Sequence, residues 1–226
     1  IVGNVEKIPY YGAGGTGNIT DLYYSEFDGD GDYFPEMYTG RLPVSDTSDL
    51  KNVVSKLIQY EKYQFADTNK FSSNALATAG IDDSHYTHMN GQVNYAMTNY
   101  LKAENKINGY SFLYPNAKKD TIIKLIDNGL SFINYTGHGS ATGWLFLNIT
   151  TSDIPALKNL NMYPFVIGNA CQTSRFSTSS FGNAMVLAPG KGAAGYIGCS
   201  ADSYLDEDFF WAVVTGPVTL NPCYET

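Results

Sequence analysis

The segment Tyr163-Pro-Phe-Val-Ile-Gly-Asn-Ala-Cys171-Gln-Thr-Ser174 decides the predicted fold of this chain. Its apolar run, residues 165–167, contains β-branched side chains and ends at Gly168, and a polar segment follows Cys171. A short apolar run bounded in this way is typical of a buried strand. In open α/β sheets, ligands bind just outside the carboxyl ends of the strands. The pattern therefore places the Cys171 thiol where a nucleophile is expected.

A histidine follows another predicted strand in the same way. Residues 130–136 are strand-like, and His138 stands between two glycines, 33 residues before Cys171. Neighbouring parallel strands would bring the two side chains together over one cleft, where the imidazole can take the proton of the thiol. The glycines let a substrate carbonyl approach the backbone, so the N–H groups of Gly139 and Cys171 would form an oxyanion hole.

Asp82 follows a third expected strand, residues 74–81, and would orient the His138 ring. Each of these residues also has a simpler interpretation. A cysteine at a strand end is commonly a small buried hydrophobe, an aspartate there is commonly a helix cap, and a histidine between glycines can be a turn residue. Their joint occurrence at strand ends favours acyl transfer through a thioester.

Strand-like and helix-like segments alternate along the chain. Apolar periodicity predicts helices after a cap at Asp46, around 93–101, after a cap at Asn116, around Pro155 and over 181–187. Further strands are expected at 110–114 and 193–198, with a short edge strand at 21–25. The order predicts an α/β fold with a mostly parallel sheet and helices on both faces. We expect one domain over residues 1–226, incomplete at one or both ends.

Charge and composition narrow the function classes. A net charge of −8 disfavours nucleic acid and anionic membranes as partners, and no apolar run is long enough to predict a membrane span. Three cysteines at irregular spacing indicate neither a disulfide framework nor a zinc site. The Tyr-, Asn- and Thr-rich composition favours an extracytoplasmic protein, and the start at Ile1 indicates a processed or excised piece.

The segment Asp28-Gly-Asp30-Gly-Asp32-Tyr-Phe-Pro-Glu36 gathers carboxylates in a tight loop. Hard cations such as Ca²⁺ prefer carboxylate and carbonyl oxygens. The spacing is not that of an EF-hand, and a solvated acidic turn is the alternative. The glycine-rich segment 11–17 lacks a phosphate-binding motif.

Several blocks in order resemble the gingipain family of cysteine endopeptidases, and most of all its lysine-specific branch. They include Asn134–Ser140, Ile167–Cys171, Asp30–Thr39 and Ser203–Asp208. The resemblance implies a caspase-like three-layer α/β sandwich. It also implies hydrolysis of peptide bonds after a basic residue, Lys ahead of Arg.

The resemblance also implies roles for individual residues. It makes Cys171 the nucleophile, His138 the acid and base, Asp82 the third member and the Gly139 N–H an oxyanion-hole donor. Substrate-binding positions would be Thr136, Tyr204 and Asp208, and the last of these would receive the basic side chain. A structural Ca²⁺, with no organic cofactor, would be held by Asp30, Asp32, the Phe34 carbonyl and Glu36.

Partners and location follow from the same resemblance. We expect protein or peptide substrates with basic residues, contact with other segments of the chain's own precursor, and a secreted or bacterial cell-surface location. Two alternatives remain: a non-catalytic caspase-fold binding or adhesion module, and a transpeptidase or ligase that uses the same thioester.

Overall fold

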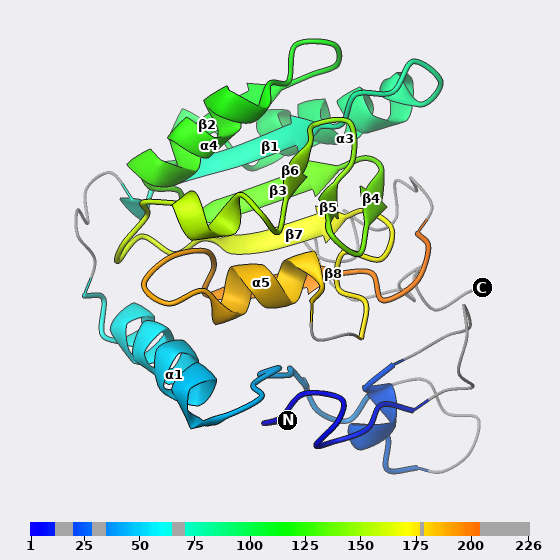
Figure 1. Cartoon of the computed structure of the whole chain (residues 1–226). Helices are drawn as coiled ribbons and strands as arrows, with labels where there is room; N and C mark the ends of the chain where they lie inside the picture. The colour runs from blue at the N-terminus through cyan, green and yellow to red at the C-terminus, as the bar shows by residue number, and fades with distance from the viewer. Residues whose placement is uncertain (12–19, 29–34, 65–70, 177–178, 204–226) are drawn as a thin grey trace.

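A five-stranded parallel sheet forms the centre of the molecule in the computed structural model, which describes residues 1–11, 20–28, 35–64, 71–176 and 179–203 (Figure 1). The strand order is β2-β1-β3-β7-β8, and every pairing is parallel. The strands are β1 Asn74–Ala79, β2 Asn108–Phe112, β3 Phe132–Thr136, β7 Phe165–Asn169 and β8 Gly195–Gly198. The sequence prediction of a mostly parallel sheet is confirmed.

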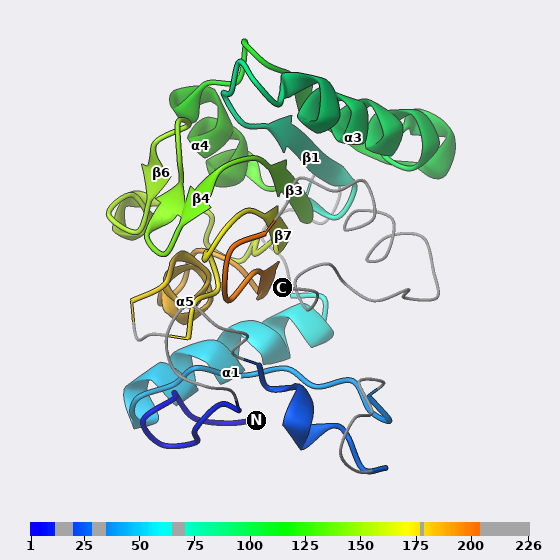
Figure 2. The same cartoon turned by 90° about the vertical axis from the view of Figure 1, so that its right-hand side faces the viewer.

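Helices cover both faces of this sheet, as Figure 2 shows from the ends of the strands. The helices are α1 Thr47–Glu61, α3 Tyr86–Asn99, α4 Lys119–Asn128 and α5 Phe181–Leu187. Alternate residues of β1 face opposite layers: Leu76 shares a core with Ile122 of α4, whereas Ala77 and Ala79 pack with Val93 of α3. This two-sided burial explains why the strands read as continuous apolar runs.

A small antiparallel sheet follows directly from the end of β3. It consists of β4 Gly139–Ser140, β5 Gly143–Trp144 and β6 Ile149–Thr150. The buried Trp144 ring stacks on Tyr135 of β3, with ring centroids 4.5 Å apart. The sequence did not predict this sheet, because two-residue strands are too short to show a period of two.

Two local predictions are wrong. Residues 21–25 form no edge strand but contain a 3₁₀ helix, η1 Leu22–Tyr24, because the Ser25 N–H and hydroxyl both donate to the Leu22 carbonyl. Asn116 does not cap a helix, because its N–H donates to Leu113 in a turn and α4 begins at Lys119.

Other helix ends agree with the predictions. The Asp46 carboxylate accepts the N–H groups of Ser48 and Asp49 at the start of α1, and Gly129 follows α4 with a φ of 99°. The described residues also form two more 3₁₀ helices, η2 Ala103–Asn105 and η3 Ile154–Ala156, and η3 contains Pro155 as predicted. Within the described ranges, no helix has both the length and the apolar character that crossing a bilayer requires.

The buried Lys56 attaches α1 to the rest of the fold. Its Nζ lies 2.5 Å from the Val186 carbonyl oxygen in the last turn of α5, 3.1 Å from that of Lys191 and 3.2 Å from that of Ala193. Burial lowers the pKa of Lys56 to about 7, and its charged form also interacts favourably with the helix dipole at the C-terminus of α5. Lys56 therefore joins α1, the end of α5 and the approach to β8.

Replacing Lys56 with methionine should destabilise the protein by about 1–3 kcal/mol, because buried carbonyls would lose their donor. Lys51→Met is the matched control, since Lys51 is an exposed lysine of the same helix and its loss should cost less than about 0.5 kcal/mol. Chemical denaturation measures both free energies of unfolding. Equal stability of the two variants would show that the Lys56 contacts do not stabilise the fold.

Candidate active site

The Asp82 and His138 side chains contact each other where the carboxyl ends of the parallel strands lie. His138 Nε2 lies 2.5 Å from Asp82 Oδ2, and the two side chains are 39% and 11% exposed, respectively. The Ser84 N–H donates to Asp82 Oδ1 over 2.6 Å and lowers the pKa of Asp82 well below its usual range, and the His85 and His138 rings lower it further. Asp82 is therefore ionised at physiological pH. The Asp82 carboxylate contacts His138 Nε2, so Nδ1 is the imidazole nitrogen that remains available to a reacting group.

Two hydrogen bonds to the carbonyl oxygen fix the backbone of His138. Its carbonyl oxygen accepts the Tyr135 hydroxyl over 2.8 Å and the Leu145 N–H over 2.9 Å. Burial raises the pKa of Tyr135, so this hydroxyl stays protonated and remains a donor. The Phe146 ring lies edge-on to the imidazole, with centroids 5.4 Å apart. The small antiparallel sheet thus positions the histidine.

The turn that follows β7 carries Cys171. Gln172, the next residue, has a φ of 58°, and its N–H donates to the Ala201 carbonyl over 2.8 Å. The Cys171 thiol lies 3.3 Å from the Ser203 carbonyl oxygen, and the Ser203 N–H donates to the sulfur over 3.4 Å. The segment after β8 therefore holds the partly exposed thiol in place.

The register of the sheet brings the two chain turns together. Thr136 of β3 is paired with Asn169 of β7, and each reactive residue stands two positions beyond its member of this pair. The approach is close, because a Cβ added to Gly139 would lie 2.6 Å from the Cys171 carbonyl oxygen. A side chain at position 139 would therefore displace the cysteine turn.

The register of the β4–β5 pair also fixes the direction in which the Gly139 N–H points. Gly139 stands opposite Trp144, and the Leu145 N–H donates to the His138 carbonyl oxygen. In an antiparallel ladder this makes Gly139 and Trp144 a non-hydrogen-bonded pair. The Gly139 N–H consequently points away from β5.

Thr136 and Glu36 are the remaining predicted site residues that the structure describes. Thr136 is fully buried at the end of β3, and its carbonyl oxygen accepts the Gly80 N–H over 2.7 Å. The Glu36 carboxylate accepts the Phe27 N–H over 2.6 Å. The other predicted substrate and calcium ligands lie outside the described residues: Tyr204, Asp208, Asp30, Asp32 and Phe34.

Two residues at the site were not predicted from the sequence. Ser203 contacts the Cys171 sulfur through its hydroxyl at 3.9 Å, and its closer contacts use backbone atoms, which no side-chain pattern reports. The Nδ1 of His85 lies 2.9 Å from Asp82 Oδ2, the same oxygen that contacts His138. The spacing of three residues between Asp82 and His85 at a helix start is the signal that would have found this contact.

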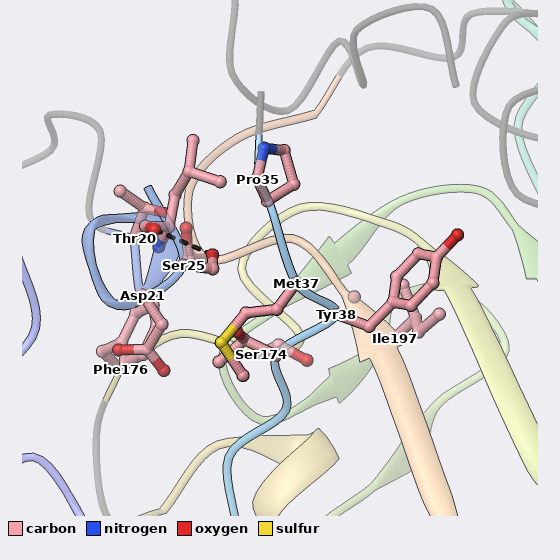
Figure 3. A pocket seen from close by; sticks show the side chains of 13 residues that line it. Thr20, Asp21, Ser25, Pro35, Met37, Tyr38, Ser174, Phe176 and Ile197 are labelled. Atoms are coloured by element: carbon pink, nitrogen blue, oxygen red, sulfur yellow. Dashed lines mark hydrogen bonds between the residues drawn. The ribbon is translucent and has the colours of Figure 1, made fainter. Parts of the chain in front are cut away.

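A pocket of about 340 Å³ lies between the N-terminal segment and the end of β8 (Figure 3). Its lining includes Asp21, Met37 and Tyr38 of the N-terminal segment, Ser174 of the segment after β7, and Ile197 of β8. Neither Cys171 nor His138 lines it. This pocket is therefore separate from the reactive residues.

Known proteins resemble this chain in both sequence and structure. Lys-gingipain HG66 of Porphyromonas gingivalis is 38% identical over the whole chain, and the match covers 13% of the length of that relative. Gingipain R2 of the same organism is 28% identical over 75% of the chain, and the match covers 23% of the length of Gingipain R2. A solved structure titled "Structure of Protease" matches 94% of the chain and 47% of its own, with a TM-score of 0.84 and 35% identity.

A second solved structure shows the same fold. The Arg-specific cysteine proteinase gingipain R matches 94% of the chain and 52% of its own at 24% identity, with a TM-score of 0.75. These matches confirm the expected caspase-like α/β fold. The family model described as Peptidase family C25 matches residues 1–219. The chain, which spans about an eighth of the length of its curated Lys-gingipain relatives, therefore belongs to peptidase family C25.

Proposed function

We propose that this chain forms the catalytic centre of a cysteine endopeptidase that cleaves after a basic residue, Lys ahead of Arg. The observation that carries the proposal is the Asp82–His138 pair at the sheet edge where Cys171 also stands. A thiol attacks a carbonyl only as the thiolate, so a neighbouring base is the first requirement.

The reaction follows from these positions. His138 takes the proton of the Cys171 thiol, and the sulfur attacks the scissile carbonyl carbon. The N–H groups of Gly139 and Cys171 stabilise the oxyanion of the tetrahedral intermediate, a contribution of roughly 3 kcal/mol per donor. His138 then donates its proton to the leaving amine, and the C–N bond breaks to leave a thioester. Water, deprotonated by His138, hydrolyses the thioester and regenerates the thiol.

The Asp82 carboxylate supports both proton transfers. Its contact with Nε2 holds the imidazole in one orientation, and its negative charge stabilises the imidazolium that forms after the first transfer. The Ser84 N–H keeps the carboxylate itself in place. Asp82 thereby acts on the reaction through His138.

The preference for a basic residue is supported by sequence alone. Asp208 falls where the lysine-specific branch has its acidic pocket residue, and relatives in the comparison carry the name Lys-gingipain. A desolvated carboxylate favours a cationic partner and penalises neutral side chains, because it would stay unpaired with them. Thr136 and Tyr204 would belong to the same binding region.

We expect Cys171→Ala to abolish peptide hydrolysis and Asp208→Asn to lower kcat/KM for Lys substrates by roughly a hundredfold, since losing one partner of a buried charge pair costs about 2–5 kcal/mol. Asp206→Asn removes the same charge from the same segment and serves as the control. Steady-state kinetics on matched Lys and Arg peptides measure both effects.

Four outcomes would contradict these assignments. Hydrolysis by Cys171→Ala would remove the thiol from the mechanism, and an unchanged Lys preference in Asp208→Asn would remove Asp208 from the pocket. Lack of turnover by the wild-type protein would favour a non-catalytic binding module. Products joined to an added amine nucleophile, in place of hydrolysis products, would identify a transpeptidase.

A structural Ca²⁺ and a secreted or cell-surface location belong to the same proposal. The loop 28–36 offers alternating carboxylates, and the Glu36 contact with the Phe27 N–H brings the two ends of this loop together. A hard cation would neutralise the like charges in such a loop. Protein substrates and contacts with other segments of the precursor are proposed on the strength of the gingipain relatives.

Calcium removal should lower the melting temperature if the ion is structural, because binding to the folded state alone adds stability. Thermal unfolding with EDTA and with added Ca²⁺ measures this shift. Glu36→Gln should reduce the shift, whereas Glu6→Gln, a change at an exposed glutamate elsewhere in the N-terminal segment, should retain it. The same melting temperature with and without EDTA would favour a solvated acidic turn.

A further inference from the structure

One carboxylate oxygen of the candidate site has two imidazole partners. Asp82 Oδ2 lies 2.5 Å from His138 Nε2 and 2.9 Å from His85 Nδ1. The three atoms that these residues offer lie within 4.8 Å of one another. The two rings stand nearly perpendicular, at 78°, with centroids 6.0 Å apart. The peptidase reaction described above uses only one of the two histidines, so His85 has no role in it.

We propose that Asp82, His85 and His138 form a binding site for a divalent transition-metal ion of the zinc class. Two imidazole nitrogens and one carboxylate oxygen are a common three-residue ligand set for Zn²⁺ with an open fourth position. Bonds of about 2.0–2.1 Å in a tetrahedral arrangement place ligand atoms about 3.3 Å apart. Each nitrogen therefore needs to move away from Asp82 Oδ2 by less than about 1 Å, and the two nitrogens, which lie within 4.8 Å of each other, need to approach by about 1.5 Å at most.

The backbones that carry the ligands are fixed, while the side chains remain accessible. The Ser84 N–H engages Asp82 Oδ1 and leaves Oδ2 for the ion. The carbonyl oxygen of His85 accepts the Met89 N–H in the first turn of α3, which anchors this residue at the helix start. The His85 and His138 side chains are 53% and 39% exposed, so an ion can reach them from solvent. Such orientation by surrounding groups is typical of functional metal sites.

Metal binding at this position would inhibit the proposed peptidase reversibly. The ion would take the Nε2 lone pair of His138 and the charge of Asp82, so the imidazole would lose the carboxylate that orients it. This consequence rests on the proposed function, whereas binding itself rests on the three side chains alone. His85 is decisive, because without it the site offers only two ligands.

The binding test uses the metal-free protein with Cys171→Ser, so that the thiol cannot act as a ligand. Calorimetric titration with Zn²⁺ should give one ion per site, and Co²⁺ should give the visible absorption of a tetrahedral complex. Adding His85→Ala should weaken binding more than about tenfold. His85→Asn is a second variant that removes the same imidazole and keeps a favourable residue at the N-cap of α3. His88→Ala is the matched control, since His88 is exposed on the same helix and should leave affinity unchanged.

The outcomes separate this site from the proposed function. Loss of the wild-type Zn²⁺ affinity in Cys171→Ser would assign the ion to the thiol, and affinity that is kept after His85→Ala is added would remove His85 from the site; either result would overturn the proposal. An active wild-type peptidase that binds no Zn²⁺ would overturn the metal site alone. Zn²⁺ binding that depends on His85, in a protein without peptidase activity, would support the metal site and refute the proposed function.

Discussion

The parallel pairing of β3 with β7 is the constraint on which the site depends. Its register sets Thr136 beside Asn169, and the Gly137 N–H continues the pairing by donating to the Asn169 carbonyl over 3.1 Å. His138 and Cys171 leave the sheet immediately beyond this point. A shift of one residue would turn alternate side chains to the opposite face and separate the two turns. Burial of both faces of the sheet, against α3 and against α4 with α5, makes such a shift costly.

Each reactive residue is positioned in part by groups outside the strand that delivers it. The Tyr135 hydroxyl and the Leu145 N–H hold the His138 carbonyl, and the Ser203 backbone holds the Cys171 thiol. Asp82 comes from the end of β1, and the Ser84 N–H fixes its carboxylate. The parallel strands bring the groups to one edge, and the connecting segments set their orientation. This division of roles agrees with the location of ligand sites in other α/β sheets.

The sequence predicted those features that depend on local periodicity. The central strands, the Asp46 cap and the apolar face of α3 around Val93 are all present in the structure. Contacts made by backbone atoms or by very short strands escaped prediction. The β4–β6 sheet shows no sequence period, and the Ser203 contact uses main-chain atoms that every residue possesses. The partner of His85 was missed because its contact depends on where the β1 turn meets α3.

The most direct test of the account is active-site labelling with a lysyl acyloxymethyl ketone, followed by intact mass measurement and peptide mapping. The account predicts a single covalent label on Cys171 in the wild-type protein and little label in His138→Ala. Iodoacetamide labelling of the unfolded variant provides the control that its thiol is intact. Equal labelling of both proteins by the ketone, or labelling at another residue such as Cys199, would contradict the claim that the β3–β7 register assembles a catalytic pair.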